Sequence, residues 1–428
     1  MPITGIKLTT STGTDVPVFG STINFELTRL QTDSDVVVTN ASVPAGNYTS
    51  LTVAFGSPSG VFINASGSAV GPCAVGAVCG ITGSFTNITV PINLTLNSNA
   101  NQWLDLDFNY NNAIDTSTGI AINLGLANVL AVNTSTPIGV PSGNFANVDD
   151  FTGRVTSVSN SSIKLTSTAR GSLTATINSS TQVFDPQATQ CASTGGVATL
   201  DCIKVGSIVS LQGLLTNTGS IVATSLDVID SSTTPIDEVE GTIYPSTCNG
   251  GSNFGMILSD SSITTGGSPL ATAGFGTGIC LTVSPTATPA VDFGILTGQP
   301  GLPATNGGFS TVTDLRAGQT IRAKITGAAS GVNGINATAT VVILRFSRLT
   351  GTVGTLSGPA FIINGLPTYI TAFTVPPSVQ TYTNATLFEG AANAGGLVSG
   401  GTVSISALFY NPIGGPAQPL QAAKVRQP

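Results

Sequence analysis

Apolar and polar residues alternate with a period of two in short runs along most of this 428-residue chain. Residues 51–55, 88–94 and 205–211 are examples, and Gly, Asn, Ser or Pro punctuate the chain at short intervals. A period of two is typical of strands with one buried face, and the punctuating residues favour turns. Residues that favour helices, such as Glu, Lys, Arg and Met, are scarce. We therefore predict an all-β protein with tandem β-sandwich and small β-barrel-like domains.

Two stretches rich in Pro, Ser and Thr interrupt the alternation and indicate domain boundaries. Residues 134–150 form the first, and residues 231–240 (SSTTPIDEVE) form the second. A third boundary, near residues 346–349, has no flexible linker, so the two units beside it are expected to abut stiffly. The predicted domains are a β-sandwich at 1–147 and three barrel-like repeats at 148–232, 233–346 and 347–428.

The three predicted repeats share ordered landmarks. Each opens with an apolar-x-Gly-x-apolar strand, around Gly153, Gly241 and Gly351. A Gly-led strand and a closing Ala-containing strand follow in the same order in each repeat: 205–211 and 221–226, 317–323 and 335–341, and 400–405 and 420–425. This recurrence predicts one supersecondary unit used three times. The glycines are expected at bends or bulges where small barrels turn their corners.

The repeats resemble the family called domain of unknown function 5666, whose modules have a Gly-x-Val start, a Gly-x-x-Val-x-Val middle strand and a closing Ala strand. The first domain resembles domain of unknown function 4382 through residues 43–51 (VPAGNYTSL) and 104–108 (LDLDF). Together the resemblances cover nearly the whole chain and imply exported bacterial or archaeal β-domain proteins. They bring no catalytic residues, and the lipobox cysteine of exported lipoproteins is missing at the start.

Composition excludes several classes of function. Only 8% of residues are charged, the net charge is −7, and histidine is absent, whereas an average soluble chain is about 25% charged. Without a basic stripe, nucleic acid is not an expected partner, and no apolar run is long enough to span a membrane. A Ser-His-Asp triad cannot exist without histidine. We expect no enzyme activity, no catalytic residues and no cofactor.

Six cysteines form three neighbouring pairs: Cys73 and Cys79, Cys191 and Cys202, and Cys248 and Cys280. None has the two-residue spacing of zinc or redox sites. We predict three local disulfides, with free buried thiols as the alternative. Bridged cysteines imply an oxidising compartment outside the cytoplasm. The opening residues lack the features of a signal peptide, so we expect the chain to begin near a mature start.

The densest set of oxygen ligands is Asp105, Asp107, Asn109, Asn111 and Asp115. Calcium is bound by about six to eight such oxygens. The EF-hand pattern fails here, because Tyr110 stands where glycine is needed and no closing glutamate follows. A calcium site and a simple acidic strand end both remain open, and we favour the strand end.

Asp237, Glu238 and Glu240 are a second acidic group, inside the second boundary. Two carboxyl groups facing each other across a cleft are the requirement for glycoside hydrolysis. One Trp and six Tyr in the whole chain make a poor platform for sugars. We therefore expect these three residues to lie on a solvated linker.

Ten Asn-x-Ser/Thr sequons are candidate glycosylation sites in a cell that glycosylates exported proteins. Their number is close to what a chain with a quarter of its residues Ser or Thr contains by chance. The asparagines are Asn40, Asn47, Asn64, Asn87, Asn93, Asn133, Asn160, Asn178, Asn336 and Asn384.

These observations favour an extracellular structural protein, a subunit of a surface filament, sheath or layer made of copies of itself. We expect the terminal segments to pair with a neighbouring subunit by strand addition, so that removing the first ten residues leaves folded monomers. The candidate contact residues are Ile3, Ile6, Leu8, Leu420 and Val425. The alternative is a monomeric cell-surface adhesin or glycan-binding protein with an aromatic or calcium-assisted concave site.

Overall fold

The predicted all-β fold is confirmed. The computed structural model describes residues 1–428 apart from 65–66, 85–86, 118, 126–127, 136–146, 187–197, 217, 235, 246–247, 249–252, 301, 303–306, 332–333, 373–375, 414–417 and 428. In the described residues the α-helices are two single turns, α1 (Tyr110–Ala113) and α2 (Thr368–Thr371). The 3-10 turns there are equally short: Arg29–Gln31, Leu200–Cys202, Pro269–Thr272, Gly294–Leu296, Val312–Asp314 and Ala394–Gly396.

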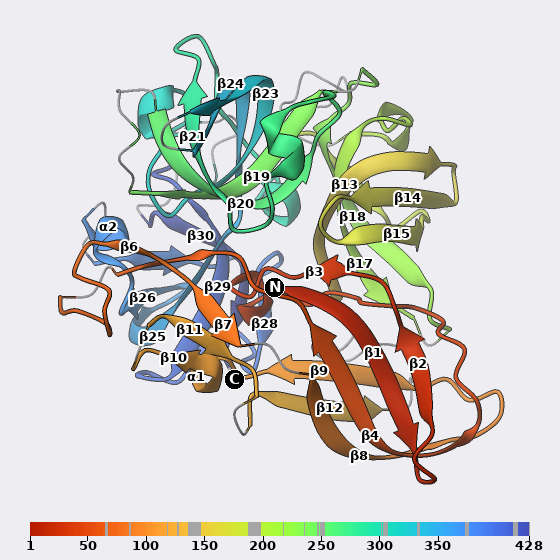
Figure 1. Ribbon diagram of the computed structural model, residues 1–428. Coiled ribbons are helices and arrows are strands. Elements are labelled where there is room, and N and C mark those ends of the chain that lie inside the picture. The colour runs from red at the N-terminus through yellow and green to blue at the C-terminus, as the bar shows by residue number, and fades with distance from the viewer. Residues whose placement is uncertain are drawn as a thin grey trace. The chain divides into compact units, whose positions relative to one another are not determined.

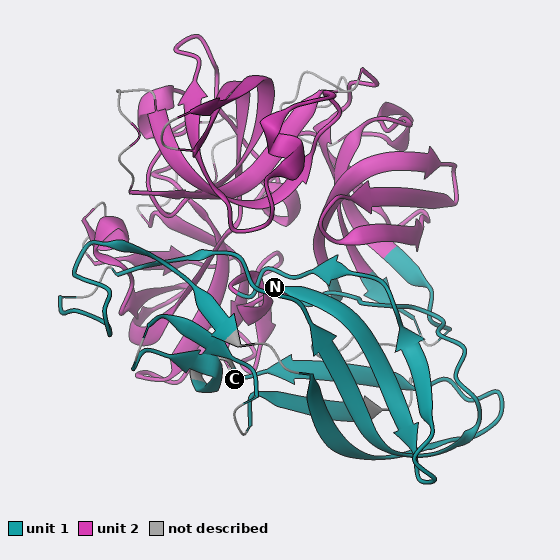
Figure 2. Ribbon diagram, in the orientation of Figure 1, with its two compact units in different colours: residues 1–27, 34–148, 214–222 teal, residues 28–33, 149–213, 223–428 magenta. Residues whose placement is uncertain are grey.

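The chain divides into two compact units (Figure 2). Unit 1 comprises residues 1–27, 34–148 and 214–222, and unit 2 comprises residues 28–33, 149–213 and 223–428. Residues 28–33 belong to unit 2 and residues 214–222 belong to unit 1, so neither unit is a single stretch of sequence. The segment 28–33 in particular leaves unit 1 and returns to it.

Unit 1 is built on a five-stranded sheet with the order β2-β1-β4-β8, in which β3 also pairs with β1 (Figure 1). Three smaller sheets accompany it: β10-β11-β7, β12-β9 and β5-β6. The strands of unit 1 are β1 (Pro2–Thr10), β2 (Asp15–Phe19), β3 (Ile23–Asn24), β4 (Gly46–Phe55), β5 (Val61–Ile63), β6 (Val78–Gly80), β7 (Thr82–Ser84), β8 (Ile88–Leu96), β9 (Trp103–Phe108), β10 (Ile114–Asp115), β11 (Ala121–Asn123) and β12 (Leu130–Ser135).

Both terminal strands are interior strands of the chain's own sheets. In β1, Ile3, Ile6 and Leu8 are buried, and the strand pairs with β2 on one side and β4 on the other. Leu420 and Val425 are buried in the last strand, β30 (Leu420–Arg426), which pairs with three strands of its sheet. They are β29 (Thr402–Phe409), β27 (Ser378–Gln380) and β28 (Leu387–Glu389). Contact with a neighbouring subunit through these five residues therefore requires exchange of a whole strand, because the pairing positions are already occupied.

Unit 2 contains three barrels with one strand order. Each has six strands in chain order, of which the first pairs with the second and fifth, and the third pairs with the sixth, so that five strands close into a barrel. The short fourth strand runs parallel beside the sixth. We call them barrel 1 (β13–β18), barrel 2 (β19–β24) and barrel 3 (β25–β30).

The barrel strands have the following bounds. Barrel 1 contains β13 (Asn147–Val158), β14 (Ser162–Ser167), β15 (Gly171–Thr176), β16 (Gln182–Phe184), β17 (Ile208–Leu215) and β18 (Ile221–Asp230). Barrel 2 contains β19 (Asp237–Tyr244), β20 (Asn253–Ser262), β21 (Gly278–Val283), β22 (Ala290–Val291), β23 (Thr320–Gly331) and β24 (Gly334–Arg345). Barrel 3 contains β25 (Ser347–Ser357), β26 (Ala360–Asn364), β27 (Ser378–Gln380), β28 (Leu387–Glu389), β29 (Thr402–Phe409) and β30 (Leu420–Arg426).

The landmark glycines lie in the first strand of each barrel, where the second strand approaches most closely. A Cβ added to Gly241 would lie 2.1 Å from the carbonyl oxygen of Ile257, and one added to Gly351 would lie 2.2 Å from that of Asn364. Gly153 is restricted less severely, since a Cβ there would lie 2.9 Å from backbone atoms of Thr166. A side chain at these positions would separate the two strands, so the glycines allow the barrels to bend.

Each of the last two barrels has an apolar interior, and the two interiors adjoin. Barrel 3 encloses its own core, which includes Phe361, Phe409 and Val425. The core of barrel 2, around Val239 and Phe309, also takes in side chains of barrel 3 such as Tyr410. Barrels 2 and 3 are thus in direct apolar contact.

Candidate functional site

The charged residues of this chain are concentrated in the interior of unit 2. Of its 33 charged side chains, 13 basic and 20 acidic, 17 are buried, and all 17 belong to unit 2. Charged side chains are almost never fully buried unless they are paired. The fold must therefore maintain the pairing of Arg29, Asp33, Asp149, Asp150, Arg170, Asp185, Asp227, Asp230, Asp237, Glu238, Glu240, Asp260, Asp292, Arg322, Arg345, Glu389 and Lys424.

The acidic group predicted to lie on a solvated linker is among these buried residues, so that prediction is wrong. Asp237, Glu238 and Glu240 all lie in β19, and the two glutamates are 1% exposed. Arg322, in the adjacent strand β23, donates to both glutamates, at 2.8 Å to Glu238 and 3.2 Å to Glu240. The sequence of this segment resembles a linker because the arginine that pairs with the glutamates lies 84 and 82 positions away from them and is not visible in the local pattern.

Asp150, in β13, joins all three barrels. Its carboxylate pairs with Arg345 at the end of barrel 2, with Arg348 in barrel 3 at 2.8 Å, and with Arg29 at 3.1 Å. Burial alone would raise the pKa of Asp150, but the three guanidinium groups outweigh it and hold that pKa well below its usual range. We call Asp150, Arg29, Asp33, Arg345 and Arg348 the junction cluster.

Asp150 also has an unusual backbone. Its φ is 49°, in the left-handed region that residues other than glycine seldom adopt. Ser210 donates to the same carboxylate, and Arg29 and Arg170 donate to the carbonyl of Asp150. Such a conformation persists where the surrounding contacts over-determine it, as they do here.

Residues 28–33 supply two members of the junction cluster. Arg29 lies in a 3-10 turn, and its Nε is 3.1 Å from Oδ2 of Asp33. Asp33 is bound in turn by Arg348 at 2.6 Å. The segment therefore brings one positive and one negative charge, which complete the pairing without changing the net charge of the cluster.

Arg345 extends the junction cluster into barrel 2. It pairs with Asp292 as well as Asp150, and its Nε lies 3.6 Å from Glu240. Glu240 is shared with Arg322, so the pairs form one continuous network. Breaking a buried pair by removing one partner costs about 3–5 kcal/mol, because a charge is left uncompensated. The network therefore opposes separation of the barrels.

A second buried set, which we call the lysine site, consists of Lys424, Glu389 and Asp149. Lys424 and Glu389 belong to β30 and β28 of barrel 3, and Asp149 belongs to β13 of barrel 1. The Lys424 Nζ lies 2.8 Å from Glu389 Oε1 and 3.0 Å from Asp149 Oδ2. Burial alone would lower the pKa of Lys424, but Asp149, Glu389 and Asp33 outweigh it and raise that pKa. The site thus holds an ammonium group between two carboxylates.

Asp227, near the end of β18, is a buried acid. Its Oδ1 has no hydrogen-bond partner. Burial raises its pKa to about 7, with Arg345 lowering it and Asp150 raising it further. Gly294 packs against it, since an added Cβ would lie 3.2 Å from Oδ2. This carboxyl group therefore titrates near neutrality.

Polar contacts bridge every pair of barrels. Lys424 and Asp149 connect barrels 3 and 1, and Lys324 connects barrel 2 to Asp230 of barrel 1 at 2.8 Å. Gln319, buried just before β23, donates to the carbonyl of Phe409 in barrel 3 at 2.8 Å. These ion pairs and hydrogen bonds hold the three barrels together.

The predicted oxygen ligands do not converge. Asp105 and Asp107 lie in β9, with Asn109 just after it, whereas Asp115 lies in β10 of a different sheet. Hydrogen bonds from the backbone and hydroxyl of Ser117 lower the pKa of Asp115. In the part of the chain that the structure describes, no three His, Cys, Asp or Glu residues are grouped to hold a metal ion. These residues give no support to a calcium site.

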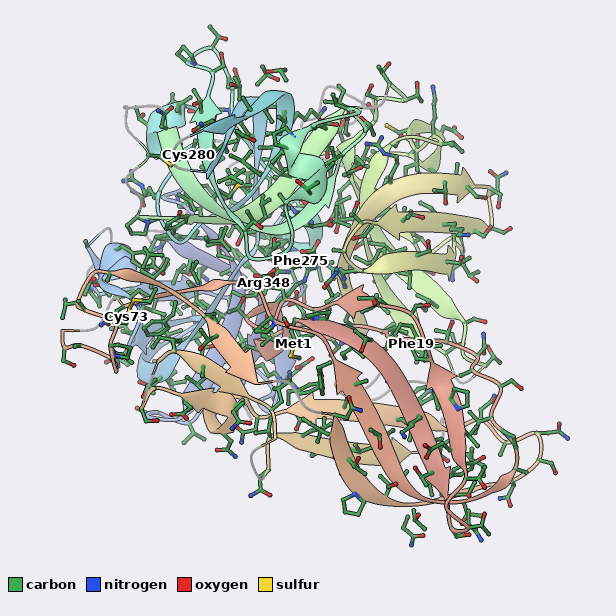
Figure 3. All side chains as sticks on the ribbon, viewed as in Figure 1. Met1, Phe19, Cys73, Phe275, Cys280 and Arg348 are labelled. Carbon is green, nitrogen blue, oxygen red and sulfur yellow. A yellow bond between two sulfur atoms is a disulfide. The ribbon has the colours of Figure 1, made fainter. Side chains whose placement is uncertain are left out.

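Two of the three predicted disulfides are present, Cys73–Cys79 and Cys248–Cys280, with Cα atoms 6.0 and 5.7 Å apart (Figure 3). Cys202 is also disulfide-bonded; Cys191 lies outside the described residues. Disulfides persist in oxidising compartments, so they indicate an exported location. No helix of the described residues has the length and apolar character needed to cross a membrane.

The sequons separate into one buried site and nine exposed ones. Asn64 is fully buried, and its Nδ2 donates to the carbonyls of Ser68 and Cys73 at 3.0 and 2.8 Å. A glycan on that nitrogen does not fit, so Asn64 is withdrawn as a candidate. The exposed asparagines are Asn40, Asn47, Asn87, Asn93, Asn133, Asn160, Asn178, Asn336 and Asn384.

One family comparison bears on this architecture. The model of the family Domain of unknown function (DUF5666) matches residues 152–227, which lie within barrel 1. The match does not repeat over barrels 2 and 3, and the first domain has no match to domain of unknown function 4382. A search of curated proteins finds no match.

Proposed function

We propose that this protein is the subunit of an extracellular filament, sheath or surface layer formed by copies of itself. The observation that carries the proposal is the internal placement of charge. With 17 of 33 charged side chains buried, at most 16 remain for the surface of 428 residues. Hydroxyl and amide groups take their place, so copies of the chain repel one another little in any salt.

The modular construction supports the same proposal. The shared strand order of the three barrels leads us to propose that barrels 2 and 3 are diverged copies of the module matched in barrel 1. We also propose that the first domain is a diverged relative of domain of unknown function 4382. Barrels joined through buried ion pairs make a stiff body, which suits a protein whose role is mechanical.

Unit 1 is the expected site of contact between subunits by β-strand pairing. Closed barrels have no free edge, whereas the five-stranded sheet of unit 1 ends in β2 and β8. Pro17 and Pro91 lie in these two strands and limit pairing to a few residues on each side of the proline. The other route is exchange of β1 or β30 between copies.

Negative-stain electron microscopy of the protein as released from its native cells tests the proposal. We expect regular filaments or sheets, and the same assemblies from purified protein at low and high salt. Dispersed monomers in both preparations would overturn it and direct attention to the adhesin alternative, through binding assays with glycans and calcium.

A further inference from the structure

The lysine site has the composition and geometry of a condensation site. Two carboxyl groups have an oxygen within 3.0 Å of the Lys424 amine nitrogen: Asp149, which would acylate the amine, and Glu389. Lys424, Asp149 and Glu389 are at most 8% exposed, and strands β30, β13 and β28 hold them. Groups fixed in contact react as though present at effective concentrations of about 10⁵–10⁸ M.

We propose that Lys424 and Asp149 form an intramolecular amide bond and that Glu389 carries the protons. Glu389 accepts a proton from the Lys424 ammonium group, and the neutral amine attacks Cγ of Asp149. Glu389 then delivers that proton, and a second one from the nitrogen, to one Asp149 oxygen. The Cγ–O bond breaks, the N–Cγ bond remains, and one water molecule leaves. Ammonium and carboxylate thus become amide and water, with Glu389 unchanged.

The interior of the protein favours this product. A buried ion pair retains a desolvation cost that its mutual attraction repays only with good geometry, and a neutral amide avoids that cost. Water that leaves the buried site enters bulk solvent, which opposes the reverse reaction. Because the ammonium form dominates at rest, the bond is expected to form slowly after folding.

The bond would join the first strand of barrel 1 to the last strand of barrel 3, across 275 positions of sequence. All three barrels would then lie within one covalent ring. This goes beyond the proposed function, and its test does not depend on assembly: a monomeric protein can carry the bond, and a filament can form without it.

Intact-mass measurement of the full chain, folded, aged, then denatured and reduced, tests the proposal. We expect a mass one water molecule below the value calculated from the sequence, and tryptic digestion should yield a linked pair of peptides containing Lys424 and Asp149. The full calculated mass in aged, folded protein would overturn it.

Matched variants locate the bond. Lys424→Arg keeps the positive charge and should restore the calculated mass, whereas Lys324→Arg, at the half-buried pair with Asp230, should leave the water loss unchanged. Glu389→Gln should slow bond formation at least tenfold. Asp149→Asn should lose ammonia instead of water. This variant keeps a side chain of the same size, so it tests the bond without relying on an alanine variant that could fail to fold. Water loss that persists in Lys424→Arg would contradict the assignment.

Discussion

Asp150 in the first strand of barrel 1 and Arg348 in the first strand of barrel 3 share a 2.8 Å hydrogen-bonded ion pair, although 198 positions separate them in sequence. Arg345, at the end of barrel 2, binds the same carboxylate. One side chain therefore connects the three barrels. A protein with few charges has placed several of them where its barrels meet.

Replacing Asp150 should destabilise unit 2 severely. In Asp150→Ala, Arg29, Arg345 and Arg348 lose a shared counter-ion inside the protein, and we expect a loss of about 3–5 kcal/mol in the free energy of unfolding. Urea denaturation followed by circular dichroism measures this loss. The control is Asp15→Asn, at the exposed pair with Lys7, which should leave the unfolding midpoint unchanged. Equal effects of the two variants would contradict the role of the junction cluster.

Stability should decrease as pH rises towards neutrality. Asp227 has a pKa raised from 3.8 to about 7 in the folded protein, so its contribution is fully present below its unfolded pKa. It declines by at most about 1.4 kcal/mol per pH unit above that value and is gone once pH exceeds the folded pKa. Arg345 and Asp150 are the charged groups that act on it. Thermal unfolding across this range should show the decline, and Asp227→Asn should reduce it; an unchanged slope in that variant would rule out Asp227 as the source.

The landmark glycines should not tolerate a side chain. Gly241→Ala places a Cβ 2.1 Å from a backbone oxygen, and we expect barrel 2 to lose about 1–3 kcal/mol or more of stability. Gly274, which has open space around it and no positive φ, provides the matched control as Gly274→Ala. The denaturation midpoint of Gly241→Ala should be lower than that of Gly274→Ala. Similar midpoints for the two variants would contradict the explanation that Gly241 is needed for the close approach of the strands.

Removing residues 1–10 should unfold the main sheet of unit 1. The sequence alone suggested that folded monomers would remain. Because β1 is paired on both sides, its loss separates β2 from β4 and exposes the apolar face beneath. Limited proteolysis should cleave unit 1 rapidly while unit 2 stays resistant. A truncated protein with resistant unit 1 would show that β1 is dispensable, as expected of a strand that serves another subunit.

Local sequence patterns predicted the strands well and the buried charges badly. Alternation and glycine placement are local signals, and the strands around Gly153, Gly241 and Gly351 followed from them. The partners of Glu240, namely Arg322 and Arg345, lie 82 and 105 positions away, and no local pattern reveals such a pairing. A usable signal was present in the chain: residues 149–150, 237–240 and 345–348 place charges at the start of each repeat in a sequence that has few elsewhere.

Differential scanning calorimetry of the intact chain tests the central claim, that buried charges unite the three barrels, most directly. We predict that barrels 1, 2 and 3 unfold in one transition in the natural protein and in separate transitions in Asp150→Ala. Separate transitions for the three barrels in the natural protein would contradict the account, because modules that unfold independently are not held together by the junction cluster.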